Sequence, residues 1–460
     1  MDEKEKQLSL WNIVGLGLGG TIGTGIFLLL GYGIAYTGKS IMLVVVVGCF
    51  FMLLAYWYNL VMPSIFVLKG GDYSMKTMLF TPLWSGFNAL LAVVGGFAMA
   101  SYSVGIAQYL GIAVPALAQY ESIVAFFVTV VVFLATTKGS YILTVLENLV
   151  TVVLVIALVL FVIFGIPQVD FASYFSNTNA DGPFFLNGFG GFVSAIAVMG
   201  WACQGTTMAP VSMAAVTKNP KKTIPFAIIL ITVLLAVIYG AMAYVAGGVL
   251  PYAEAAGANI SVTAEAILPG ALYLFFVIGG GIGAILSSEL GALGMYRYPL
   301  MQIAEDGWIP SVFKKTDKNG YPYLTYLAYF VITVFPIVTG MSLDAIVSLV
   351  MIPSMLINIY MNLACISLPK KYPEQWENRS LRIPVWFYNV CCVLGAFCAG
   401  AVAYNLFVDL TKSDAIVCAV IVIVMFAVSF IRLKQGAVKA EDLAAKKEAI
   451  IKEALEPEKN

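Results

Sequence analysis

Residues 16–27 read LGLGGTIGTGIF and place five glycines and two threonines in a stretch otherwise apolar enough to cross a bilayer. Gly19, Gly20, Gly23 and Gly25 fall within seven residues, and each weakens a helix by about 1 kcal/mol relative to alanine. Close packing between membrane helices requires a small residue only at about every fourth position. The glycine density therefore favours an interrupted helix, with close packing as the alternative.

An interrupted helix in the middle of a membrane can bind a small zwitterion. Its free N–H and C=O groups are tolerated in lipid only where they line a cavity or bind something. The start of the second half, near Thr24 and Gly25, carries partial positive charge and suits a carboxylate. The carbonyl end of the first half suits a cation or an ammonium group. Together the two ends match the main chain of an amino acid.

A second span, at residues 188–216, has the same character and supplies the partner that an inverted repeat requires. It is the sixth span along the chain, and the first and sixth spans are the matching pair of a five-plus-five repeat. Its glycines and deep polar residues are Gly188, Gly190, Gly191, Gly200, Gly205, Gln204, Thr206 and Thr207.

A carboxylate and two hydroxyls form another group with potential chemistry. Glu289 lies in ILSSELGALGMYR, inside the eighth span, where a carboxylate costs about 2.5–3.5 kcal/mol on insertion scales. We expect Glu289 to carry protons or contact a substrate amine, with a structural or permanently protonated role as the alternative. Ser287 and Ser288 could form a sodium site with carbonyls of the first span, although bonds to their own helix are the simpler role. The chain contains no histidine, so proton coupling must use carboxylates.

The elements that position these residues must be membrane helices. Of the 460 residues, 61% are hydrophobic and 11% are charged, and the mean hydropathy is +0.92. This leaves too little polar surface for a soluble globule. The apolar runs are solid rather than alternating, which argues against a β-barrel. The formal net charge of zero gives no reason to expect a nucleic-acid partner.

Stretches long enough to cross a bilayer number about twelve, which places both termini on one side. Lys and Arg mark that side as the cytoplasm, because all 25 basic residues except Lys39 and Lys412 fall there. The expected spans are residues 10–36, 41–67, 83–114, 123–137, 141–166, 188–216, 224–249, 271–298, 323–339, 343–368, 384–408 and 415–431.

We therefore expect a multi-pass plasma-membrane protein surrounded by lipid. The N-terminus lacks the features of a cleaved signal peptide. The charged tail is rich in helix formers, which favours a solvated or membrane-surface helix over a regulatory plug. The expected parts are a cytoplasmic N-terminus at 1–9, a transporter core at 10–368, two further helices at 384–431 and a cytoplasmic tail at 432–460.

Neither a cofactor nor an enzyme activity is expected. No metal site is predicted apart from the sodium site considered above, and no nucleophile–base arrangement is evident. The cysteines lie in apolar segments without CxxC spacing, which argues against a disulfide framework or a zinc site. They are Cys49, Cys203, Cys365, Cys391, Cys392, Cys398 and Cys418.

Four motifs, in order, resemble the amino acid-polyamine-organocation (APC) superfamily. GGTIGTGIFLLLG is similar to its first-helix pattern G-x-I-G-S/T-G-I-F, and GGDYSMK to its GG-x-Y element. GWACQGTTMAPVSMAAVTKNPKKTIPFAI resembles the end of its sixth helix, which a K-N-P-x-x-x-I/L-P run follows. MYRYPLMQIAEDGWIP resembles its R-x-x-x-x-x-A-x-D-G-x-x-P run. The resemblance covers about residues 8–431.

The resemblance implies a LeuT-type fold with discontinuous helices 1 and 6, and alternating-access transport of amino acids or their amines. Trp201 lies next to the helix break, where we expect it to serve packing or gating. Arg297 and Asp306, in the run that resembles the fourth motif, are expected to belong to a gate or a loop. The resemblance also implies three sets of binding residues. The backbone of Thr21, Ile22, Gly23, Thr24 and Gly25 would bind the substrate carboxylate. The ammonium group would be bound by carbonyls of the same segment and of Ala197, Val198, Met199 and Gly200, and the substrate side chain would be selected by Ile196, Met199, Trp201 and Cys203.

Three departures from the superfamily pattern bear on the substrate. Many members carry an acidic residue where this chain has Ala202, and some carry a lysine where it has Leu154. Ile196 and its neighbours are apolar, whereas members that handle basic amines often have an aromatic or acidic group there. A small or medium neutral amino acid, moved by symport or exchange, is therefore expected. The alternatives are an amino acid/amine antiporter linked to decarboxylation, a non-transporting amino acid sensor and a channel.

Overall fold

The computed structural model describes residues 8–137, 140–176, 182–214, 217–317 and 321–455. In these ranges the named elements are all helices, as the sequence predicts, and an isolated β-bridge joins Leu8 to Thr217. The first half forms α1 (Leu10–Thr21), α2 (Thr24–Thr37), α3 (Ile41–Ala55), α4 (Trp57–Ile65), α5 (Gly71–Leu79), α6 (Pro82–Val94), α7 (Gly96–Ala113), α8 (Glu121–Thr136), α9 (Ser140–Gly165) and α10 (Phe171–Tyr174).

The second half continues with helices of very different lengths. A π-helix, η5 (Phe276–Ile282), joins α16 to α17. The helices are α11 (Gly188–Cys203), α12 (Gly205–Ser212), α13 (Pro220–Gly248), α14 (Tyr252–Ala255), α15 (Ser261–Ile267), α16 (Gly270–Phe275), α17 (Gly283–Glu305), α18 (Tyr323–Thr339), α19 (Leu343–Cys365), α20 (Leu368–Lys371), α21 (Pro373–Glu377), α22 (Val385–Val408), α23 (Lys412–Lys434) and α24 (Ala440–Glu453).

Ten helical runs among the described residues are long and apolar enough to cross a membrane. They match the expected spans except at two places. One run, Thr24–Ala55, belongs to both the first and the second expected spans and is divided by a 3-10 turn at Gly38–Ser40. The ninth expected span, Tyr323–Thr339, is a shorter apolar helix. The chain is thus built as a multi-pass membrane protein, and the number of twelve crossings stays a prediction.

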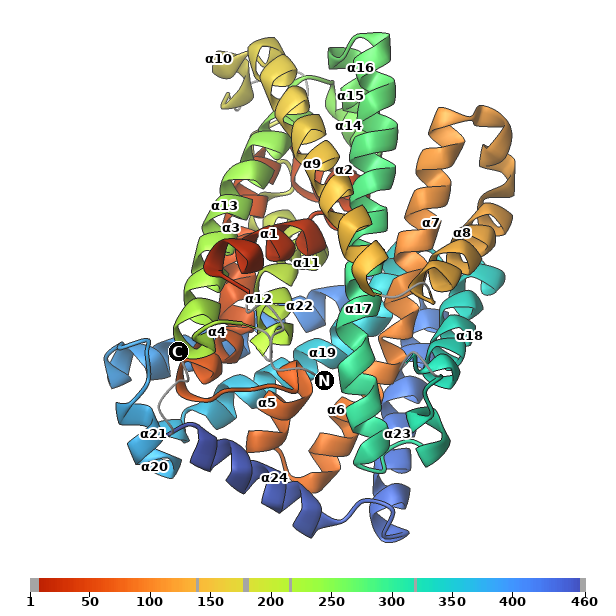
Figure 1. The fold of residues 1–460 in the computed structure, drawn as a ribbon. Coiled ribbons are helices and arrows are strands. Elements are labelled where there is room, and N and C mark those ends of the chain that lie inside the picture. The colour runs from red at the N-terminus through yellow and green to blue at the C-terminus, as the bar shows by residue number, and fades with distance from the viewer. Residues whose placement is uncertain (1–7, 138–139, 177–181, 215–216, 318–320, 456–460) are drawn as a thin grey trace.

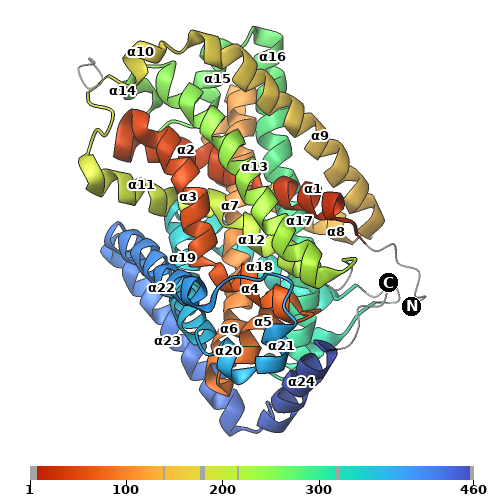
Figure 2. The ribbon, with the colours of Figure 1, turned by 90° about the vertical axis from the view of Figure 1, so that its left-hand side faces the viewer.

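The long helices run between two ends of the molecule. Short helices α10 and α14 lie toward one end, and α20, α21 and α24 lie toward the other (Figure 1, Figure 2). We call these the α14 end and the α24 end.

The predicted interruption of the first span is confirmed. Ile22 and Gly23 separate α1 from α2, and Ile22 is extended (φ −79°, ψ 101°). The sixth span is also interrupted, but only by Gln204, whose torsions stay close to helical values (φ −70°, ψ −28°). The broken spans pack as crossed pairs, α1 against α12 and α2 against α11. They therefore run in opposite directions, as an inverted repeat requires.

Two irregular segments were not predicted. Tyr56 (φ −111°, ψ 31°) separates α3 from α4, and neither glycine nor proline marks this position in the sequence. The eighth span contains η5, and such π-helical turns are often found at functional sites. Within η5, Gly281 lies directly against the ring of Tyr109, so α7 and the eighth span approach closely.

The connection between α14 and α15 lies along α2. The Gly257 N–H donates to Gly31 O (2.8 Å), and the Ile260 N–H donates to Phe27 O (3.2 Å). A methyl group added at Gly31 would overlap the backbone carbonyl of Ala258. Because backbone cannot move aside as a flexible side chain can, this contact requires glycine.

Gly31→Ala is therefore expected to lower the free energy of unfolding by about 1–3 kcal/mol, the usual cost of overpacking. Thermal or chemical denaturation of the purified protein in detergent measures the change. Gly190→Ala is the matched control, because Gly190 is also helical but has no neighbouring atom within 4 Å of the added methyl. Equal stability of the two variants would contradict the close contact.

Candidate functional site: the interrupted helices

The carbonyl end of α1 is held by hydroxyl groups from two other helices. Ser288 on α17 donates to Ile22 O (3.2 Å), and its oxygen lies 3.5 Å from Gly19 O. Tyr239 on α13 donates to Thr21 O (3.3 Å). Ser288 and Tyr239 are buried, so these oxygens form a polar cluster inside an apolar core. Such a cluster of carbonyl and hydroxyl oxygens suits a cation or an ammonium group.

The amino end of α2 adjoins the same interruption. Its N-cap is Gly23, and no side chain caps it. The first N–H groups of a helix have no intrahelical partner and attract negative charge. At this end the Trp201 indole N–H donates to the Thr24 hydroxyl (3.0 Å), so a side chain from the sixth span reaches the first turn of α2. The predicted backbone segment from Thr21 to Gly25 therefore offers carbonyl acceptors at one end and N–H donors at the other.

The glycines here also serve close packing, so both sequence interpretations describe part of the site. A methyl group at Gly23 would overlap Ser288, and one at Gly25 would overlap the backbone of Ala202. Gly20 has no neighbour within 4 Å of an added methyl. Packing thus explains several glycines but does not account for Gly20 or for the interruption itself.

The predicted residues of the sixth span face two directions. Trp201 and Ala202 face the interruption of the first span, through Thr24 and Gly25. Met199 instead lies against Gly33 of α2.

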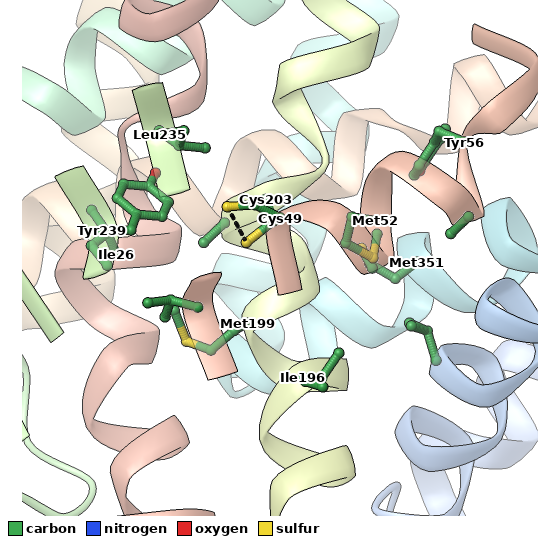
Figure 3. Packing of buried hydrophobic residues seen from close by; sticks show 14 of the residues in the cluster. Ile26, Cys49, Met52, Tyr56, Ile196, Met199, Cys203, Leu235, Tyr239 and Met351 are labelled. Carbon is green, nitrogen blue, oxygen red and sulfur yellow. Dashed lines mark hydrogen bonds between the residues drawn. The ribbon is translucent and has the colours of Figure 1, made fainter. Parts of the chain in front are cut away.

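Cys203 and Gly200 are directed toward α3. The Cys49 thiol donates to the Cys203 sulfur (3.5 Å), and Met52 packs over Gly200. Figure 3 shows this part of the core, in which Ile196 and Met199 lie among other buried apolar side chains. The structure does not bring Met199 or Cys203 against the interruption, and their role in selecting the substrate stays a prediction.

The open carbonyls of the sixth span lie further along the chain than expected. Ala197, Val198, Met199 and Gly200 are all inside α11, and Gly200 O accepts the Gln204 N–H (3.0 Å). The Thr206 hydroxyl donates to Cys203 O (3.1 Å). Since these groups are already bonded, an ammonium group would meet the carbonyls of the first span more readily than those of the sixth.

Tyr56 is a residue of this region that sequence reasoning missed. Its hydroxyl donates to Gln204 Oε1 (2.8 Å) and lies 3.2 Å from the Ser354 hydroxyl on α19. The hydrogen bond therefore joins the irregular residue of the second span to the irregular residue of the sixth. The signal available in the sequence was a run of aromatic and amide residues, AYWYN, inside an apolar span.

Glu289 is fully buried and bonds away from the interruption. Its Oε1 accepts a hydrogen bond from Ser103 on α7 (2.8 Å), and Thr129 on α8 donates to Ser103 (2.9 Å). Glu289 Oε2 and the Ser287 hydroxyl have no hydrogen-bond partner. Of the three residues considered for ion coupling, Ser288 is the one that reaches the α1 carbonyls. This geometry favours proton exchange or a structural role over substrate-amine contact for Glu289.

The described part of the chain has no group of three or more His, Cys, Asp or Glu side chains placed to hold a metal ion, and its seven cysteines are free and buried. The oxygens that would fit a sodium ion are those of Gly19, Ile22 and Ser288. Leu154, where some superfamily members carry a lysine, is buried in apolar contacts.

Asp306, from the fourth sequence motif, belongs to a separate polar group at the α24 end. Its oxygens accept the Tyr73 hydroxyl (2.6 Å) and the Gln302 amide (2.9 Å), and the Trp308 indole donates to Tyr73 (2.9 Å). Burial, and then the Asp306 charge, raise the pKa of Tyr73 well above its usual value, so the phenol stays protonated and donates. The second and fourth motifs thus meet in space. The side chain of Arg297 lies outside the described residues.

A multi-pass helical protein whose two interrupted membrane spans pack in opposite directions has the build of a secondary transporter. The family model for amino acid permease matches residues 8–428. The chain therefore belongs to the amino acid permease family of the APC superfamily, which confirms the resemblance of its motifs.

Two individual relatives are similar over most of this chain, and a third over about a third of it. The branched-chain amino acid permease BcaP of Bacillus subtilis is 28% identical over 404 residues, covering 80% of this chain and 82% of that protein. The histidine permease HisP of Lactococcus lactis is 26% identical over 364 residues, which is 74% of each chain. A cadaverine/lysine antiporter of Escherichia coli is 31% identical over 177 residues, 37% of this chain and 38% of that protein.

The link between Tyr56 and Gln204 can be tested by removing one hydroxyl. Tyr56→Phe leaves Gln204 Oε1 without its donor, and a net hydrogen bond is worth about 0.5–1.5 kcal/mol. If the two irregular residues move together during transport, we expect turnover to fall about threefold to tenfold, with little change in melting temperature. Initial rates of amino acid uptake and thermal denaturation measure the two effects. Tyr404→Phe, on an exposed face of α22, is the control, and equal turnover in both variants would remove Tyr56 from the mechanism.

Proposed function

We propose that this permease is a secondary active transporter that moves amino acids across the plasma membrane by alternating access. The observation that carries the proposal is the interruption at Ile22 and Gly23, which joins a group of oxygens to an uncapped helix N-terminus. The main chain of an amino acid fits such a pair of ends, with its carboxylate toward Thr24 and Gly25 and its ammonium toward Ile22 O. The crossed pairing of the first and sixth spans supports a LeuT-type arrangement with twelve helices.

A small or medium neutral side chain suits the surroundings of this interruption. Ala202 packs against Gly25, at the position where many superfamily members have an acidic residue, and Glu289 bonds to Ser103 instead. Neither offers a negative charge to a basic substrate. Trp201 borders the interruption and is a candidate gate. The similarity to a branched-chain amino acid permease is compatible with a medium apolar substrate.

Coupling to an ion has two candidate sites on α17. Glu289 would carry protons through its unpartnered oxygen, whereas Ser288, with the carbonyls of Gly19 and Ile22 and the nearby Ser287, would hold sodium. We retain both, together with exchange of one amino acid for another.

The orientation follows from the distribution of basic residues. α5, α20 and α24 carry lysines and lie toward the same end of the molecule (Figure 1). Because basic segments are held in the cytoplasm, we propose that the α24 end is cytoplasmic, as are both termini.

The decisive experiment is an uptake screen in proteoliposomes. The twenty amino acids and common amines are tested with and without sodium and with and without a pH gradient. Saturable uptake of neutral amino acids supports the proposal. Counterflow driven by an internal amine would instead identify an antiporter, to which the partial similarity to a cadaverine/lysine antiporter points. Binding without flux would identify a sensor, and flux without saturation would identify a channel.

Gly25→Leu is expected to abolish uptake, because the new side chain overlaps the backbone of Ala202 and displaces the first turn of α2, which is proposed to bind the carboxylate. Uptake is measured at matched amounts of protein in the membrane. Gly15→Leu is the control, since Gly15 lies on the same span and has no atom within 4 Å of an added methyl. Near-normal uptake by Gly25→Leu would defeat the site assignment.

Glu289→Gln is expected to make uptake independent of a pH gradient if Glu289 carries the proton. The amide oxygen still accepts the Ser103 hydroxyl, but it cannot gain or lose a proton. Uptake is followed over a range of external pH. Glu121→Gln is the control, because Glu121 accepts the Gln108 amide (3.1 Å) near the end of a span. Unchanged pH dependence in Glu289→Gln would exclude Glu289 from coupling.

A further inference from the structure

The tail helix α24 has no part in the proposed binding of substrate, yet it is attached to the rest of the molecule along its length. Figure 1 shows it running across the α24 end, below α5 and α6. Solvated tail helices have no need of such attachments, so each contact bears on what the helix does.

The first attachment is an ion pair between Lys446 and Asp306. The side chain of Asp306 is only 2% exposed, whereas that of Lys446 is 48% exposed. Asp306 already accepts the hydroxyl of Tyr73 and the amide of Gln302. Lys446 therefore neutralises a buried carboxylate at the end of α17, and an unpaired buried carboxylate is costly.

Two further attachments join α24 to the segment between the second and third expected spans. The Lys447 ammonium donates to Phe80 O (2.9 Å), which directly follows α5. Glu453 forms an ion pair with Lys69, which precedes α5. The tail helix is thus bonded to the chain both before and after α5.

The last turn of α24 is held from two other directions. Lys221, at the start of α13, donates to Ala454 O (2.9 Å). Gln375, on α21, donates to Ile451 O (3.3 Å). Cations and donors are favourable at the carbonyl end of a helix, so these contacts satisfy groups that would otherwise face water.

Apolar contacts tie α24 to two separate parts of the core. Leu443 belongs, with Tyr73 and Trp308, to a hydrophobic cluster that contains residues of α7, α8, α17 and α18. Ala454 belongs to the larger cluster, which contains residues of α2, α3, α11 and α13, and Ile451 packs against it. The helix therefore bridges the part of the core that holds the interrupted spans and the part that packs beside it.

We propose that α24 is a strap that keeps the α24 end closed and must loosen from Asp306 and α5 for this end to open. The inference rests on the proposed alternating-access transport, in which one group of helices moves relative to another. Such movement at this end would pull the two core clusters apart, and α24 spans them. Lys446 is a point at which release can begin, because its side chain is 48% exposed and its ion pair is therefore open to water and salt on that side.

The strap is tested with a reversible bridge in the full-length protein. Lys69 and Glu453 are both replaced by cysteine and joined with a short bis-thiosulfonate reagent, which a reductant removes. The native cysteines are buried, so background reaction is low. We expect the bridge to abolish amino acid uptake in proteoliposomes and the reductant to restore it. Each single-cysteine variant, treated in the same way, is the control. Full uptake by the bridged protein would overturn the strap.

Loosening the strap gives the opposite result. Lys446→Ala should raise the initial uptake rate about threefold, the effect of a partly exposed ion pair. It should also speed amide hydrogen exchange across residues 440–454. Lys439→Ala, which changes an exposed lysine at the N-cap of α24, should do neither. Unchanged amide hydrogen exchange in Lys446→Ala would overturn the strap. Absence of uptake in the unmodified protein would defeat the proposed function, while the exchange experiment would still decide whether Lys446 holds α24.

Discussion

The structure depends on how the backbone groups at Ile22 and Gly23 are satisfied inside a membrane. A helix can cross lipid because it pairs its own N–H and C=O groups, and an interruption gives up that pairing. Here the carbonyl side is supplied with donors from α13 and α17, through Tyr239 and Ser288. The N–H side receives no side-chain cap. The carbonyl groups at the interruption thus have hydrogen-bond donors, whereas the N–H groups can still bind an acceptor.

This arrangement requires three neighbouring helices to come unusually close to the interruption. Gly23 lets α17 approach, Gly25 lets α11 approach, and Gly205 brings α12 against Thr21. The same glycines that weaken the helix therefore make room for the residues that compensate the interruption. Close packing and helix breaking, which look like competing explanations in the sequence, act at the same positions.

Much of this architecture can be predicted from the sequence, because long apolar runs form membrane helices and clusters of glycine interrupt them. The runs predicted the helical membrane fold, and the glycines predicted the interruption between α1 and α2. The details that failed depend on contacts between distant segments. Apart from the run AYWYN, nothing local to Tyr56 indicates a break, because the geometry of this residue is linked to Gln204 on another span. The direction of Glu289 was equally hidden, since it is decided by Ser103 on α7.

The contact between Gly25 and Ala202 limits how the substrate preference of this chain could change. The Cα of Ala202 lies 2.4 Å from the position that a Cβ atom at residue 25 would take, so the backbones of α2 and α11 are in direct contact. A carboxylate introduced at position 202 has no room to turn toward the interruption unless the two helices first move apart. Charge selectivity in this chain is therefore a property of helix spacing as much as of residue type, and it could change only through linked substitutions on both spans.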